Sequence, residues 1–260
     1  MSAETALQEP PLTRPRDRLP GRSPWVAMYH SVDDCPDDPY NVTVTPDRLR
    51  QQLHWLRSRG LRGVSVAELL DARSCGAGRG LVALTFDDGY GDFVENALPL
   101  LRHYDCSATV FVLPGRLGGE NGWDAEGPRK PLLSAQGIRA AAAAGIEIGS
   151  HGLMHVDLTR VGEEERRAEI RHSKARLEEL TGHEVHGFCY PYGAIDAATV
   201  DAVRGAGYRY GCAISPGPLT SVHALPRLYV GQRDTPWRLE LKRRVHRVRR
   251  RAWHLGEDAR

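Results

Sequence analysis

Short apolar runs alternate along the chain with segments whose apolar residues recur at helical spacing. Such runs are typical of strands buried on both faces, and they begin at residues 25, 81 and 107 and, less clearly, near 146, 188 and 208. Spacings of three and four residues predict helices over 46–59, 94–104, 134–145, 162–182 and about 196–206. Most predicted strands are thus followed by one predicted helix.

Several predicted helices carry suitable residues at their ends. Thr45 suits the N-cap of the first helix, Pro46 its first turn and Gly60 its end. The helix at 162–182 has acidic residues in its first turn and glycine at its end, as the helix dipole and the C-cap favour. The boundaries of the strand–helix units are therefore readable from the chain.

Strands separated by single helices pair in parallel, so we expect one α/β domain on a parallel sheet, either open or curled into a barrel. Residues 1–23 combine proline, arginine and glutamate with few apolar side chains, which predicts a disordered leader. We therefore divide the chain into a leader (1–23), a single domain (24–235) and a basic C-terminal helix or tail (236–260).

Polar residues stand directly after four of the predicted strands. His30 ends the first, Asp87 and Asp88 follow 81–86, His151 follows 146–150, and Tyr190 begins a Tyr-Pro-Tyr-Gly sequence. Because the carboxyl ends of parallel strands meet at one rim, these side chains are expected to form a site there.

Asp88, His151 and His155 form a candidate metal site. Adjacent carboxylates are costly to bury unless a cation or proton offsets them, although a simple Asp-Gly turn is the alternative for an isolated pair. His151 and His155 are four residues apart and share one face of a helical turn. Two imidazoles and one carboxylate suit Zn²⁺, Co²⁺, Fe²⁺ or Mn²⁺. The five cysteines include no CxxC pair, so neither a thiolate zinc site nor a disulfide framework is expected.

Three short motifs carry a family resemblance. TFDDG at 85–89, SHGLMH at 150–155 and YPYG at 190–193 resemble, in this order, the motifs of the NodB-homology polysaccharide deacetylases, carbohydrate esterase family 4. The resemblance extends from about residue 25 to about 230. It implies a distorted (β/α)7-type barrel and a divalent metal, Zn²⁺ first among the candidates, held by Asp88, His151 and His155. It also implies Asp87 as general base and the backbone N–H of Tyr192 as oxyanion donor.

The chain departs from the usual family pattern in its third and later motifs. Cys189 stands where the family often has arginine, and the late motif that supplies a protonating histidine is missing. MYHSV at 28–32 is similar to the opening strand of the permuted subgroup that deacetylates poly-N-acetylglucosamine, which implies that His30 protonates the leaving amine. A buried histidine bonded to the backbone is the alternative. Arg227 is the candidate for the missing positive charge beside Asp87.

The resemblance implies a metal-dependent hydrolase that removes N-acetyl groups from a GlcNAc-type glycan or glycan intermediate. Tyr190, Pro191, Tyr192 and Trp123 are expected to contact the sugar, with ordinary loop packing as the alternative for Trp123. Two other functions stay open: hydrolysis of another non-peptide C–N amide, and a catalytically inactive carbohydrate-binding barrel.

Charge matters mainly at the C-terminal end. The net charge is only +2, but the segment 237–253 holds a cluster of arginines interleaved with apolar residues. A solvated helix is one interpretation and contact with an anionic membrane surface is the other, whereas nucleic-acid binding is not expected. No apolar run approaches the ~20 residues of a membrane span, and the N-terminus lacks an apolar signal-peptide core. We therefore expect a cytoplasmic protein, with peripheral contact to a membrane as the open alternative, and the sequence does not indicate its oligomeric state.

Overall fold

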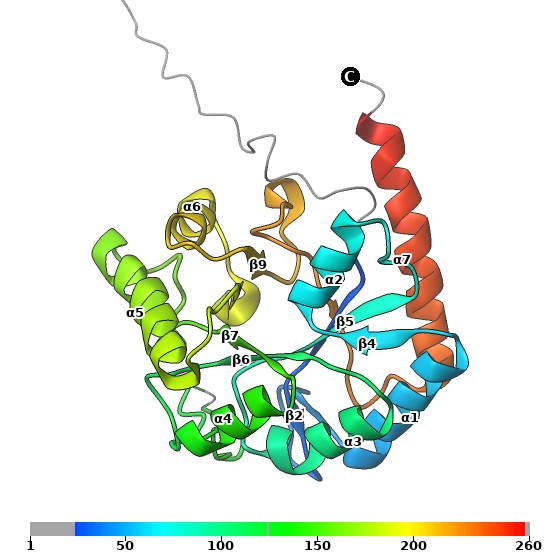
Figure 1. Ribbon diagram of the computed structural model, residues 1–260, viewed down its shortest axis with the longest axis horizontal. Coiled ribbons are helices and arrows are strands. Elements are labelled where there is room, and N and C mark those ends of the chain that lie inside the picture. Colours follow the sequence, from blue (N-terminus) through cyan, green and yellow to red (C-terminus); the bar gives the residue numbers. More distant parts are fainter. Residues whose placement is uncertain (1–23, 124, 258–260) are drawn as a thin grey trace, which may run out of the picture.

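The computed structural model describes residues 24–123 and 125–257, with side chains up to residue 246. The predicted leader, 1–23, lies outside the described residues. Seven strands form the main path of one parallel sheet, in the order β10-β1-β5-β6-β7-β8-β9 (Figure 1). Their bounds are β1 Val26–Tyr29, β5 Leu81–Phe86, β6 Thr109–Val112, β7 Glu147–Ser150, β8 Gly187–Cys189, β9 Tyr210–Cys212 and β10 Leu228–Tyr229.

The sheet curls because strands far apart in its order are linked by one segment. Leu225 pairs with Cys212 of β9, and three residues later the same segment enters β10, where Leu228 pairs with Ala27 of β1. A further strand, β4 (Arg62–Val64), pairs with the first half of β5, while β6 pairs with its second half. Short strands β2 (Ser31–Val32) and β3 (Thr43–Val44) form a separate parallel pair. The expected parallel α/β barrel is confirmed as a curled parallel sheet.

Of the α-helices in the described residues, all but the second cover the outside of the curled sheet (Figure 1). The α-helices are α1 Pro46–Ser58, α2 Val66–Ser74, α3 Leu98–His103, α4 Ala135–Ala143, α5 Glu163–Thr181, α6 Ala197–Gly205 and α7 Pro236–Glu257. The Thr45 side chain caps α1 by accepting from the N–H of Arg48, and Gly182 ends α5 in the left-handed conformation, as expected. The predicted helix at 94–104 is divided into a π-helical turn, η2 (Phe93–Ala97), and α3, with Pro99 in the first turn of α3. Of the described helices, none has the length and apolarity that a membrane span requires.

Side chains of the strands alternate between two buried clusters. Along β5, Val82, Leu84 and Phe86 belong to the larger cluster, which includes side chains of every described α-helix except α2. Ala83 belongs to a smaller cluster, together with Val66 and Leu69 of α2. The smaller cluster also holds Phe111 of β6, and its members face the inside of the curl. The same period-two alternation continues past the strand ends and decides which rim residues face inward.

Candidate metal and active site

The two-residue alternation of side chains along the strands places the rim residues together on the inner side of the curled sheet. Asp87 continues the inward face of β5, and its N–H still donates to Tyr29 O at 3.0 Å, so the ladder persists beyond the strand. His30 has the parity of Val26 in β1. His151 is an odd number of residues beyond Ile148, which faces the helices, so the side chain of His151 faces the opposite, inner side. The N–H of His151 donates to Val112 O at 2.9 Å. Three separate strands thus deliver these side chains to one place.

Asp88, His151 and His155 converge as the sequence predicts. One carboxylate oxygen of Asp88 lies 3.2 Å from Nε2 of His151 and 3.3 Å from Nε2 of His155. All three side chains are buried, and their ligand atoms lie within 4.8 Å of one another. Ligand bonds of ~2.1 Å to one ion separate neighbouring ligand atoms by about these distances. The residues present therefore fit a divalent metal.

Backbone contacts aim the two histidines. Nδ1 of His151 lies 2.8 Å from the carbonyl oxygen of Cys189. A carbonyl only accepts, so Nδ1 carries the proton and Nε2 offers its lone pair on the metal side. Glu169, buried in α5, accepts from the N–H groups of Leu153 and Met154 at 2.8 and 3.0 Å. This carboxylate fixes the turn that presents His155.

The site is also where the backbone is strained. Asp88, His155 and Tyr192 have φ values of 69°, 67° and 59°, in the left-handed region that side chains other than glycine seldom adopt. Each such residue costs about 1–3 kcal/mol, and such residues cluster at functional sites. Three of the five described non-glycine residues with positive φ therefore lie in the candidate site.

Arg227 takes the place of the missing family arginine. Its two terminal nitrogens donate to the two carboxylate oxygens of Asp87 at 2.6 and 2.7 Å, and its Nε donates to Ala213 O at 3.1 Å. Burial alone would raise the pKa of Asp87, but the charge and hydrogen bonds of Arg227 hold that pKa below its usual value. The expected position of Arg227 is confirmed, and Asp87 is kept as a carboxylate, the form that accepts a proton.

His30 lies on the other side of Asp87. Its Nε2 is 3.9 Å from Oδ2 of Asp87, and its side chain keeps 17% of its surface exposed. Its Nδ1 is buried without a hydrogen-bond partner among the described residues, so the alternative of a histidine fixed by the backbone is not what the structure contains. The sequence-based assignment of His30 as acid stays a prediction, and its position beside Asp87 is compatible with it.

Two aromatic side chains flank His155. The ring of Trp123 stacks on His155 with centroids 4.3 Å apart and 17° between planes, and Tyr192 meets it edge-on at 4.5 Å. The guanidinium of Arg116 lies over the Trp123 ring at 5.5 Å. Tyr192 leaves 55% of its surface exposed. Trp123 and Tyr192 therefore adjoin the candidate metal ligands, and their expected contact with a sugar stays a prediction.

The expected sugar contacts of Tyr190 and Pro191 are wrong. Tyr190 is fully buried in the outer cluster with Phe188, and its hydroxyl donates to His223 O at 2.7 Å. The reason is parity: Tyr190 is two residues beyond Phe188 and shares its helix-facing side. Pro191 is buried as well, and neither side chain is available to a ligand.

Cys189 lies inside the site but is not a reactive thiol. Its Sγ is 3.6 Å from Oδ2 of Asp87, and burial raises the pKa of the thiol well above its ordinary value. A thiol in this state is a poor nucleophile. All five cysteines are free, as the sequence indicates.

A buried ion cluster, which sequence reasoning missed, ties the loop of Trp123 to the rim. The ammonium of Lys130 contacts the hydroxyl of Ser31 and lies 3.2 Å from carboxylate oxygens of both Asp33 and Asp92. Asp92 in turn accepts from the Ser31 hydroxyl at 2.6 Å. The cluster joins the residue after His30, the segment after Asp88 and the loop. Sequence reasoning also missed Glu169. The only sign of its role in the sequence is that an acidic residue stands beside Ile170, on the apolar side of the predicted helix.

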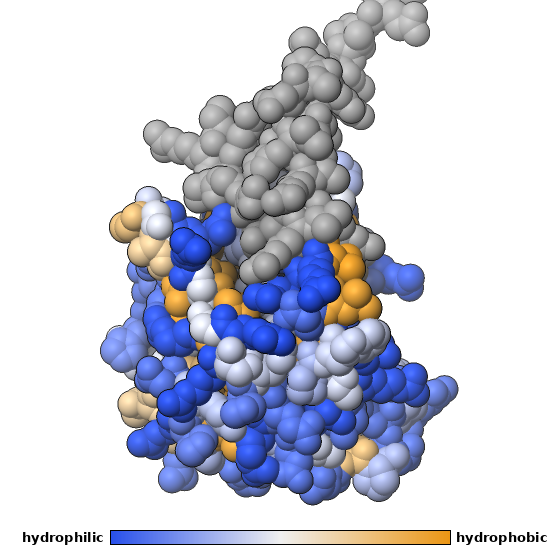
Figure 2. Space-filling model, turned by 90° about the vertical axis from the view of Figure 1, so that its right-hand side faces the viewer, coloured by the Kyte–Doolittle hydropathy of each residue, from blue (hydrophilic) through white to orange (hydrophobic). Residues whose placement is uncertain are grey.

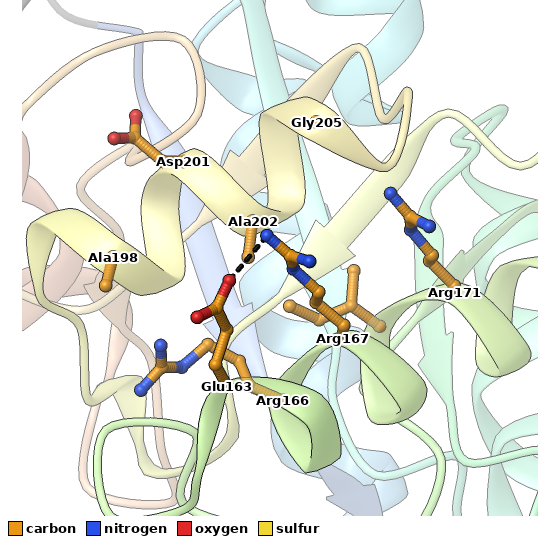
Figure 3. Close-up of a pocket in the computed structure, with 9 residues that line it drawn as sticks. Glu163, Arg166, Arg167, Arg171, Ala198, Asp201, Ala202 and Gly205 are labelled. Atoms are coloured by element: carbon orange, nitrogen blue, oxygen red, sulfur yellow. Dashed lines mark ion pairs between the residues drawn. The ribbon is translucent and has the colours of Figure 1, made fainter.

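A separate groove of about 390 Å³ lies between α5 and α6 (Figure 3). Two of its three arginines have structural partners: Arg167 pairs with Glu163 at 2.5 Å, and Arg166 donates to the carbonyl oxygens of Leu158 and Val161. None of its lining residues belongs to the site at the rim. We assign it no role in catalysis.

The chain is similar to known polysaccharide deacetylases. The polysaccharide deacetylase family profile matches residues 76–211. The chain is 26% identical over 210 residues to a putative polysaccharide deacetylase, YxkH, of Bacillus subtilis, covering 79% of this chain and 70% of that protein. It is 23% identical over 203 residues to the poly-beta-1,6-N-acetyl-D-glucosamine N-deacetylase of Staphylococcus aureus, covering 73% of this chain and 68% of that one.

A solved structure shares the fold over most of both chains. The Streptococcus pyogenes deacetylase PplD, solved in complex with acetate, superposes with a TM-score of 0.71 at 24% identity, covering 85% of this chain and 98% of that one. The curled sheet with its helices is thus a known deacetylase architecture. Because the family profile spans more than half of the residues, the chain belongs to the polysaccharide deacetylase family.

Proposed function

We propose that this protein is a metal-dependent hydrolase that removes N-acetyl groups from GlcNAc-type sugars. One observation carries the proposal: the buried triad of Asp88, His151 and His155 converges beside Asp87, whose carboxylate Arg227 holds ionised. An inert binding barrel has no need for a charged carboxylate at a metal triad. The mixed nitrogen and oxygen ligands favour Zn²⁺, with Co²⁺, Fe²⁺ and Mn²⁺ as the other candidates.

The triad would hold the metal, which when bound supplies Lewis acidity toward the acetamide carbonyl and acidifies water. Asp87 accepts the proton of the attacking water. It can do so because the two hydrogen bonds from Arg227 hold its carboxylate group in a fixed orientation and in the ionised form. The backbone N–H of Tyr192 donates to the oxygen that becomes negative. His30 then gives a proton to the amine nitrogen as the C–N bond breaks, which yields acetate and a free amino sugar.

The substrate class is supported by two features. The S. aureus relative is named for its action on poly-beta-1,6-N-acetyl-D-glucosamine. At the site, the partly exposed rings of Trp123 and Tyr192 lie beside the triad, and aromatic rings are the side chains on which sugar rings stack through their C–H groups. A glycan or glycan intermediate with N-acetylglucosamine units fits both.

The test follows acetate release from chito-oligosaccharides. Protein stripped with a chelator should be inactive, and Zn²⁺ or Co²⁺ should restore activity. If simple acetamides release acetate with the same efficiency, the protein is a hydrolase of a broader class of amides and is not specific for sugars. Bound metal with no acetate released from any acetamido sugar would overturn the proposal and favour a carbohydrate-binding barrel.

A further inference from the structure

Helix α7 presents an apolar stripe to solvent. Trp237, Leu241 and Val245 are spaced four residues apart and keep 73%, 49% and 42% of their surface exposed. They make up three of the eight large hydrophobic side chains that are exposed among the described residues. The sequence continues the stripe at spacings of three or four with Val248, Ala252 and Leu255.

The opposite side of α7 is firmly attached to the domain. Leu239 is 3% exposed and belongs to the main core. Glu240 pairs with Arg59 beside α1 at 3.3 Å, and Lys242 pairs with Asp234 at 2.6 Å. Farther along, the ring of His246 lies 6.0 Å from Trp25. The stripe is therefore the outward face of a docked helix, and packing within the domain leaves it uncovered.

Positive charge is concentrated in the sequence of α7. Between residues 236 and 257 the chain has eight arginine or lysine residues and two glutamates, although its net charge as a whole is only +2. The exposed side chains of Arg238 and Arg244 are next to the stripe in sequence and keep 53% and 74% of their surface. On the side of the molecule where α7 lies, Figure 2 shows hydrophobic residues at the surface among strongly hydrophilic ones.

We propose that α7 is an interfacial helix that binds the protein to an anionic membrane surface. Apolar residues on one face with arginine around them is the pattern of helices that lie in the headgroup region. Trp237, Leu241 and Val245 would enter that region while the arginines contact anionic headgroups. A second copy of the chain is a worse partner, because pairing two such helices would bring like charges together.

The position of α7 decides how the enzyme would sit on the membrane. The helix begins near Asp234, after β10, and passes Trp25 at the start of β1, so it runs antiparallel to β1 along the side of the sheet (Figure 1). A helix lying in the interface thus keeps the strands roughly parallel to the surface. The catalytic rim then opens sideways, within reach of a glycan held at the membrane and free of the bilayer itself.

The experiment measures sedimentation of the full chain with vesicles of phosphatidylcholine alone or mixed with phosphatidylglycerol, without substrate. We expect binding at least tenfold tighter to the anionic vesicles, and weaker binding in high salt. The double variant Trp237→Ser/Leu241→Ser keeps every basic residue and should bind at least tenfold less. Tyr40→Ser removes an exposed aromatic residue from another part of the surface and should bind like the wild type.

Several results would overturn the proposal: no vesicle binding by the wild type, equal binding to neutral and anionic vesicles, or equal binding by the double variant. A wild-type dimer that the double variant abolishes would assign the stripe to a second copy. If the double variant loses its native circular dichroism, Leu241→Ser alone and Arg244→Gln replace it with the same expectations. Acetate release from soluble chito-oligosaccharides should not change in these variants, so the membrane proposal and the proposed activity can fail separately.

Discussion

Arg227→Met isolates the contribution of one buried charge to catalysis. Arg227 is 1% exposed and gives both oxygens of Asp87 a hydrogen bond, at 2.6 and 2.7 Å. Methionine has a similar reach but no charge. Breaking a buried ion pair from one side costs about 3–5 kcal/mol, because the remaining charge loses its compensation. We therefore expect the free energy of unfolding at neutral pH to fall by about that amount in urea titrations.

The sign of the pH effect follows from the two opposing influences on Asp87. Burial raises its pKa, and Arg227 lowers it below the usual value. In the wild type, the ionised carboxylate stabilises the fold above the pKa of the unfolded chain, and this contribution is lost as pH falls through the folded-state pKa. Without Arg227, burial dominates and the pKa of Asp87 rises. The acid limb of the kcat/KM profile should then move to higher pH, because the base is protonated over a wider range.

The matched control is Arg209→Met, which removes an arginine from an ion pair with Asp71 that is largely exposed, 46% and 60% for the two side chains. Exposed pairs contribute about 0–1 kcal/mol, so this variant should keep its stability and its pH profile. An acid limb in Arg227→Met that coincides with that of the wild type would refute the argument that Arg227 holds Asp87 ionised.

Variants at four further residues test the site. His151→Ala should abolish metal binding in elemental analysis, and full occupancy would remove this residue from the ligands. His30→Ala should keep its metal and lose about 10²-fold or more in turnover, and normal turnover would place the acid elsewhere. Trp123→Ala should raise KM for chito-oligosaccharides several-fold with metal retained, and an unchanged KM would restrict the ring to packing on His155. Glu169→Ala should weaken metal binding about 10–100-fold. Glu169→Gln keeps an oxygen that accepts from Leu153 and Met154, so it should weaken metal binding less. Wild-type metal affinity in both variants would contradict the positioning role.

The triad was predictable because two independent rules agree on it. Buried apolar runs locate the strand ends, and the motifs containing Asp88, His151 and His155 fall at those ends. Most helices were predictable from spacing and from caps such as Thr45. Tyr190 was assigned wrongly because the sequence does not show which side of this short strand faces inward; the structure places both Phe188 and Tyr190, two residues apart, in the outer cluster.

Other features depend on tertiary contacts that leave little trace in the chain. Strand β10 has two residues, too few to show a pattern, and yet it is the strand that brings Arg227 to Asp87 across 140 residues of sequence. The predictions also passed over β4 and α2, and α2 alternates apolar and polar residues too weakly to stand out. In the sequence, Lys130 is an ordinary lysine of a loop, and only the fold shows that it contacts Asp92 and Ser31. Long-range pairing of charges is decided by the fold, and spacing along the chain does not report it.

The division of work between the adjacent aspartates is the centre of the proposed chemistry, and Asp87→Asn and Asp88→Asn test it directly. Metal content and acetate release are measured on the same preparations of each variant and the wild type. We predict that Asp87→Asn keeps its metal and loses about 10²-fold or more of its turnover, whereas Asp88→Asn loses both. Wild-type turnover in Asp87→Asn, or full metal content in Asp88→Asn, would contradict the account.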